Sequence, residues 1–193
     1  MRQERHDRTA ECLRTHAGRL GFSSSREGSY MRRGSRTSNR PQARWDLHCH
    51  IRPGAGHILV DVSYINPLAA SYVRRSARQA GSAAQVRDAE KLRDYLHDHN
   101  CPGHTFRAVS FELHGRYSRG AMQFITEVAH AAFPGAHSGW LRSRALANVY
   151  SQLAVIRCQY NSRMLTAAAG LNTAHTGTSW IRGGAVPEAD LYE

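Results

Sequence analysis

The segment 57–65, HILVDVSYI, constrains the fold more than any other part of the chain. Side chains alternate between the two faces of a strand, so one face of this segment is expected to carry Ile58, Val60, Val62 and Tyr64. The other face is expected to carry Leu59, Asp61 and Ser63. The segment 44–50, RWDLHCH, alternates in the same way, and a Pro-Gly-Ala-Gly sequence at 53–56 favours a tight turn between the two. We therefore expect an antiparallel hairpin.

The remaining patterns predict one mixed α/β domain. Helical spacing is found in the first 22 residues and in three later segments, 68–98, 118–133 and about 138–169. Further strands are expected around 27–31 and over 106–113. This order predicts a mixed central sheet of about four strands flanked by helices, with extra C-terminal helices. We divide the chain into an N-terminal helix, strand and basic loop (1–43), the α/β core (44–170) and a tail expected to be disordered (171–193).

The charge balance favours a polyanionic partner. Lys and Arg number 26 against 15 Asp and Glu, a formal net charge of +11, and nucleic acid is the default partner of such a chain. Four widely spaced Cys without a CxxC pair predict reduced thiols in an intracellular protein. The absence of an apolar run of 18 residues excludes a membrane-spanning helix, and the N-terminus does not have the pattern of a secretory signal.

Two carboxylates, Asp46 and Asp61, lie in the middle of the two hairpin strands among apolar neighbours. Carboxylates brought together across a hairpin repel each other, and a divalent cation such as Mg²⁺ or Mn²⁺ relieves that repulsion. A second interpretation is equally open, because one Asp could cap or turn a strand while the other pairs with one of the 25 Arg.

Lys91 is the only lysine of the chain, in the helical segment VRDAEKLRDYL. It falls at the flank of the expected inner stripe, which consists of Val86, Ala89, Leu92, Tyr95 and Leu96. A flanking Lys can lay its stem along the core and aim its ammonium at the sheet. The alternative is a solvated Lys beside Glu90 and Asp94. Glu27 and Glu112, near strand ends, are weaker candidates.

A histidine-rich segment has plausible zinc-ligand chemistry: His97, His99, Cys101 and His104. Its spacing matches no standard finger, because no second ligand pair follows at the usual distance. The sequence His48-Cys49-His50 is no better, since alternation places both His on one face of a strand and Cys49 on the other.

Three segments together resemble a known family: RWDLHCHIRPGAGHILVDVSYINPLAASYV, EKLRDY and AVSFELHGRYSRGAMQFI. They are similar to the restriction-enzyme-like endonuclease region of site-specific non-LTR retrotransposon polyproteins and of reverse-transcriptase-associated proteins. The resemblance covers roughly residues 5–170. It implies the PD-(D/E)xK nuclease fold, cleavage of DNA with Mg²⁺ and a chain that is a fragment of a longer polyprotein.

The resemblance also assigns roles to residues. The first Asp of the family corresponds to Asp46, with Trp45 where Pro usually stands, and the second corresponds to Asp61. The helical Lys corresponds to Lys91, and Glu27 and Glu112 match acidic positions of the family. Ser63 stands where a standard D-x-K sequence has its Lys, so the implied activity requires Lys91 to reach in from the helix.

The resulting hypothesis is a nuclear, Mg²⁺-dependent DNA endonuclease. Asp46 and Asp61, with Glu27, would serve the metal, and Lys91 would orient water or stabilise phosphoryl charge. Eight arginines are expected to grip the DNA backbone: Arg32, Arg33, Arg36, Arg40, Arg44, Arg74, Arg75 and Arg78. The alternative hypothesis is a catalytically inactive basic nucleic-acid-binding fragment of such an element.

Overall fold

The computed structural model describes residues 2–30, 43–50, 57–98 and 103–169. It forms two units, Met1–Asn161 and Ser162–Glu193, and the sheet and all sites below belong to the first. The elements in chain order are α1 (Arg2–Arg19), β1 (Ser23–Tyr30), β2 (Ala43–His50), β3 (His57–Ile65), α2 (Val73–Ser76), α3 (Ser82–Asp98), β4 (His104–Glu112), α4 (Arg119–Ala132), the 3₁₀ turn η1 (Ala136–Ser138) and α5 (Gly139–Ala168).

The four strands form one mixed sheet in the order β1-β2-β3-β4. β2 pairs antiparallel with both β1 and β3, which confirms the predicted hairpin, whereas β3 and β4 run parallel. A parallel pair requires a crossover connection, and α2 and α3 supply it. The predicted α/β class with about four strands is therefore confirmed. Among the described helices, none combines the length and the apolar character that a membrane span requires.

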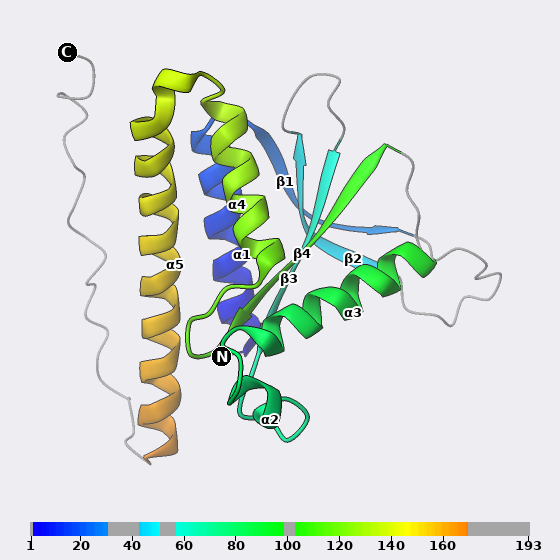
Figure 1. The fold of residues 1–193 in the computed structure, drawn as a ribbon, viewed down its shortest axis with the longest axis vertical. Helices are drawn as coiled ribbons and strands as arrows, with labels where there is room; N and C mark the ends of the chain where they lie inside the picture. Colours follow the sequence, from blue (N-terminus) through cyan, green and yellow to red (C-terminus); the bar gives the residue numbers. More distant parts are fainter. Residues whose placement is uncertain (1, 31–42, 51–56, 99–102, 170–193) are drawn as a thin grey trace. The chain divides into compact units, whose positions relative to one another are not determined.

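The alternation of β3 separates two cores, one on each face of the sheet. Val60 and Val62 are fully or almost fully buried in the larger core, which α1, α4 and α5 cover. Leu59 lies in the smaller core on the opposite face, beneath Tyr95 of α3. Figure 1 shows α1 and α4 on one side of the sheet and α3 on the other. Asp61 and Ser63 therefore belong to the face that α3 covers.

The prediction of one long helix over 68–98 is wrong for the first half of that segment. Only α2 is helical between Ile65 and Ser82, because the chain turns at Asn66, whose side-chain oxygen accepts the N–H of Leu68 at 3.0 Å. Most side chains of 68–80 are exposed, so no apolar stripe holds a longer helix on the sheet. Gly81, with a φ of 81°, then redirects the chain into α3.

The inner face of α3 also differs from the prediction. Tyr95 is buried as predicted, but Ala89 and Leu92 are exposed, and Ala84, which was not part of the predicted stripe, is buried. The buried carboxylate of Glu112, at the end of β4, accepts the N–H groups of Ala83 and Ala84 and so caps the start of α3. Glu112 is thus a structural residue rather than a site residue. The orientation that it helps to fix turns Lys91 toward the sheet.

Candidate functional site

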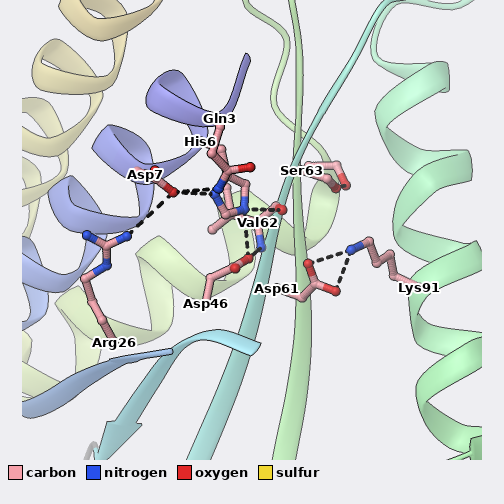
Figure 2. A network of polar contacts seen from close by, with 10 residues as sticks. Gln3, His6, Asp7, Arg26, Asp46, Asp61, Val62, Ser63 and Lys91 are labelled. Atoms are coloured by element: carbon pink, nitrogen blue, oxygen red, sulfur yellow. Dashed lines mark hydrogen bonds and ion pairs between the residues drawn. The ribbon is translucent and has the colours of Figure 1, made fainter. Parts of the chain in front are cut away.

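Lys91 and Asp61 form the centre of the candidate site. The Lys91 ammonium lies 2.6 Å from both carboxylate oxygens of Asp61, so the helix reaches directly onto the middle of β3 (Figure 2). The two side chains are 22% and 15% exposed, which leaves the pair accessible to solvent. The predicted approach of the single lysine to the sheet is therefore present, and its solvated alternative is not.

Opposing influences act on the charge of Asp61. Burial raises the pKa of this carboxyl, the Lys91 ammonium opposes that rise, and the negative charge of Asp46 adds to it. Asp61 is thus a carboxylate whose ionised form is costly and depends on a nearby cation. Lys91 is that cation here, and a divalent ion would act on the carboxyl in the same direction.

Asp46 is held by a different set of partners. The register of β2 and β3 runs from the His50–His57 pair to the Leu47–Val60 pair. One step further along, the Oδ2 atom of Asp46 accepts the N–H of Val62 at 2.6 Å, in place of a strand carbonyl. The same oxygen lies 3.1 Å from Nε2 of His6 in α1. Asp46 therefore both completes the sheet hydrogen bonding and pairs with a cationic side chain.

Asp46, Asp61 and Lys91 were expected to act together at one metal centre, but the two carboxylates do not share one set of partners. His6 engages Asp46 from the α1 side of the sheet, and Lys91 engages Asp61 from the α3 side. Figure 2 shows the two carboxylates turned toward these different partners, on either side of the β3 backbone at Val62. They are still close enough for the charge of Asp46 to raise the pKa of Asp61. The structure thus contains two adjacent carboxylate–cation pairs.

The strand alternation predicted for β2 fails at the same point. Leu47 and Cys49 lie in the larger core as expected, but Trp45 packs against the smaller core instead. The change coincides with the end of the β2–β3 register, beyond which the Asp46 side chain rather than the Asp46 backbone bonds to β3. Sequence alternation assumes a continuous ladder and so does not reveal this departure.

His6 was not singled out from the sequence as a partner of Asp46. Its hydrogen bond to Asp46 raises the pKa of the ring to about 9 against the opposing effect of burial, so the ring is charged at neutral pH. The second ring nitrogen, Nδ1, lies 3.2 Å from Asp7. The available signal was position: His6 lies one turn before Ala10 and two turns before Leu13 on the buried stripe of α1.

Further polar groups line the sheet beneath α3. Ser63 bonds to Ser110 of β4 through the two hydroxyl oxygens, 2.8 Å apart. Asp88, one turn before Lys91, accepts the N–H of Gly120 at 3.1 Å, and burial raises the pKa of its carboxyl. A Cβ at position 120 would lie 2.1 Å from the carbonyl oxygen of Ala108, so Asp88 and β4 together require glycine at this position. Asp88 gave no sequence signal, because nothing distinguished it from its charged neighbours.

The other predicted site residues are placed only in part. The backbone of Glu27 lies in β1 and that of Arg44 in β2, but their side chains are outside the described residues. Arg74 and Arg75 in α2, and Arg78 after it, are exposed. Several predicted side chains also lie outside the described residues: Arg32, Arg33, Arg36, Arg40, His97, His99 and Cys101. His104, at the start of β4, is described and lies beside other histidines.

Comparison with known proteins does not assign a family. No protein-family model matches the chain, and no curated protein matches it significantly in sequence.

Proposed function

We propose that this chain is a Mg²⁺-dependent endonuclease that hydrolyses phosphodiester bonds of DNA, and that its α/β fold is a PD-(D/E)xK nuclease core. The observation that carries the proposal is the contact of the only lysine with Asp61, next to a second carboxylate, Asp46. A buried strand carboxylate, a neighbouring carboxylate and a lysine are the groups that metal-assisted phosphodiester hydrolysis needs. A DNA substrate makes a nuclear location part of the same proposal.

The residues present fit a hard divalent cation. Mg²⁺ is usually bound by one or two carboxylates, with water and phosphate oxygens in its remaining positions. Asp46 and Asp61 supply carboxylates, and their side chains are 17% and 15% exposed. Burial and mutual repulsion already make the ionised form of Asp61 costly, and a bound cation would remove that cost.

A bound Mg²⁺ would supply Lewis acidity toward the scissile phosphate and lower the pKa of an attacking water. The ammonium of Lys91 carries three N–H donors, and two of them reach the oxygens of Asp61. The third can be donated to a phosphoryl oxygen or to the water. Lys91 thereby stabilises negative charge that develops on the phosphate, while Asp61 keeps the ammonium in position.

His6 acts as a positioning residue on the opposite side of β3. Its imidazolium and the N–H of Val62 both contact Oδ2 of Asp46, which fixes the carboxylate relative to the strand. The remaining oxygen, Oδ1, is then the candidate metal ligand. A positively charged ring is suited to this task, because it pairs with the carboxylate from α1 without using a second strand residue.

Binding of the DNA backbone is assigned to arginines. Arg74, Arg75 and Arg78 are exposed in and just after α2, which precedes the helix that carries Lys91 (Figure 1). Guanidinium groups contact phosphates in a bidentate manner and do not read sequence by themselves. Together with the net charge of +11, they support binding with little sequence preference and a strong dependence on salt.

One observation favours a second candidate, a basic DNA-binding module without catalysis. Each carboxylate already has a cationic partner within the chain, and Ser63, at the position of the D-x-K lysine, bonds to Ser110 instead. A centre neutralised in this way is stable without a metal. The two candidates share DNA binding and differ in hydrolysis.

Nicking of supercoiled plasmid separates them. The wild-type chain is expected to nick DNA with Mg²⁺ and to stop when EDTA is added, and Asp61→Asn is expected to abolish nicking while DNA affinity changes little. Asp94→Asn is the matched control, because Asp94 lies on the same helix as Lys91 with a 65% exposed side chain. Nicking that survives in Asp61→Asn contradicts the proposal. Tight DNA binding without any wild-type nicking identifies the inactive module.

A further inference from the structure

Histidines line up across one end of the sheet, on the face that α3 covers. His50 is the direct partner of His57 in the β2–β3 register, and His57 is the direct partner of His104 in the β3–β4 register. Directly opposite residues of neighbouring strands have Cβ atoms about 5 Å apart on the same face. His48, two residues before His50 on β2, adds a fourth ring to this face.

The rings are in contact, and three of them direct nitrogens toward one another. Nε2 of His48 lies 3.0 Å from Nδ1 of His57. The ring centroids of His50 and His57 are 4.1 Å apart, and those of His48 and His50 are 4.5 Å apart. One ring nitrogen from each of His48, His50 and His57 lies within 4.8 Å of the other two.

These separations suit a small tetrahedral ion. Ligand nitrogens of a tetrahedral zinc site, at about 2.0–2.1 Å from the metal, are about 3.3 Å apart. The His48–His57 separation of 3.0 Å is already near that value, and modest ring rotations bring the third nitrogen in. His50 is exposed, so its ring can turn without disturbing the core, and His57 is half-buried.

We propose that His48, His50 and His57 form a zinc-binding site that joins β2 to β3, with its fourth position open to water or to His104. Three imidazoles with one open position are a donor set that zinc commonly takes, and imidazole is a much poorer ligand for Mg²⁺. The site is separate from the carboxylate centre. His57 and Asp61 lie on the same face of β3, about 13 Å apart along the strand, with Leu59 between them.

This site differs from the histidine segment noted in the sequence. Of the residues expected to bind zinc there, only His104 is shared with the new cluster. His48 and His50 were set aside because Cys49 points away, and Cys49 is indeed fully buried in the larger core. The third ligand, His57, is brought in by the antiparallel register rather than by sequence spacing.

Zinc binding is tested on the full chain, purified without a polyhistidine tag and freed of metal by a chelator. Competition of Zn²⁺ with a chromophoric chelator, together with elemental analysis, is expected to show one zinc per chain. His57→Ala and His50→Ala are each expected to weaken binding at least about 100-fold, because loss of a direct ligand exceeds the usual effect of an outer-shell change. His130→Ala, an exposed histidine of α4, is the matched control and is expected to bind as the wild type does.

Three results would overturn the proposal: no stoichiometric zinc in the wild-type chain, binding that survives in both His57→Ala and His50→Ala, or binding that is lost in Cys101→Ser. The last result would place the zinc on the segment 97–104. Because His50 is exposed, His50→Ala removes a ligand without opening the core, and circular dichroism of the metal-free variants verifies that they are folded. None of these readouts depends on nuclease activity.

Discussion

The two carboxylates of β2 and β3 are charged groups of the same type in adjacent positions, yet the fold treats them differently. On the α1 side, Asp46 accepts a backbone N–H of the sheet and is paired with the imidazolium of His6. On the α3 side, Asp61 is bound through both oxygens by the flexible side chain of Lys91. The first carboxylate is part of the sheet, whereas the second has a partner that can move.

This difference separates a positioning role from a reacting role. If the Asp46 carboxylate moved away from β3, the buried N–H of Val62 would lose its acceptor. Asp46 is therefore suited to offer one oxygen to a metal at a fixed position. The ionised form of Asp61 is costly because of burial, and a lysine ammonium on a four-carbon stem can exchange places with a metal or share it. We therefore expect chemistry to depend most on the α3 side and stability to depend most on the α1 side.

The largest expected effect is on nicking by variants of the two cations. Lys91→Met is expected to lower the rate of Mg²⁺-dependent nicking by about 10³-fold, because it removes a charge-stabilising donor from the phosphate. His6→Gln, which acts only through Asp46, is expected to lower it by about 10-fold or less. Plasmid nicking at saturating DNA measures both rates. Equal losses in the two variants would contradict the division of roles.

The next largest effect is on stability, where we expect the change on the α1 side to cost more than the change on the α3 side. Asp46→Ala leaves the Val62 N–H without its acceptor and leaves the His6 imidazolium with Asp7 alone, at a cost of about 2–4 kcal/mol in the free energy of unfolding. Asp61→Ala is expected to cost about 1 kcal/mol, since it also removes a costly buried charge and lets Lys91 turn to solvent. Urea unfolding at pH 7 compares the two. A larger loss of unfolding free energy in Asp61→Ala would show that the carboxylate on the α3 side contributes more to stability than the one on the α1 side.

The pH dependence of stability sharpens the same comparison. The pKa of His6 is about 9 in the folded chain and near 6.5 when unfolded, so its contribution is fully present below pH 6.5 and is lost as the pH rises through 9. The wild type is expected to lose about 2–3 kcal/mol over this range relative to His6→Gln. Asp61 contributes with the same sign at lower pH, because its pKa is raised by burial. Parallel stability curves for wild type and His6→Gln between pH 6 and 9.5 would mean that the ring is not paired with Asp46.

The smallest effect concerns the exposed arginines. Replacement of Arg74, Arg75 and Arg78 by Gln is expected to weaken DNA binding modestly and to reduce the slope of log K against log salt by at most about 2.7, or 0.9 for each lost phosphate contact. Nicking at saturating DNA is expected to stay close to the wild-type rate. Fluorescence anisotropy at several salt concentrations measures the slope, and an unchanged slope would remove this surface from the DNA interface.

The sequence predicted the elements better than the contacts between them. β3 has the predicted bounds, and the hairpin was predicted from the alternation of its two strands. A strand close to β4 was also expected, but its parallel pairing with β3 was not predicted. The approach of Lys91 to Asp61 was expected from the family resemblance, because the residues alone left the solvated alternative open. The predicted inner stripe of α3 was right at Tyr95 and wrong at Ala89 and Leu92, since Asp88 and Lys91 have polar partners beneath the helix that hydrophobic periodicity cannot represent.

The missed features depend on registers and gaps in the sheet. The contact of His6 with Asp46 lies where the pairing of β2 with β3 ends, next to Leu47, and no local pattern indicates that end. The histidine cluster arises because His50, the last residue of β2, and His57, the first residue of β3, lie opposite each other at the turn end of the hairpin. A one-residue shift in register would have moved one of these rings to the other face.

The proposed function requires Asp46 and Asp61 to share one divalent cation, although their partners His6 and Lys91 approach from opposite sides of the sheet. Electron paramagnetic resonance of Mn²⁺ added to the folded chain tests it directly, because bound Mn²⁺ loses the sharp signal of the aqueous ion. We expect one bound Mn²⁺ that is displaced by Mg²⁺ and lost in both Asp46→Asn and Asp61→Asn, but retained in His57→Ala. Binding that is unaffected by either Asn substitution would contradict the account.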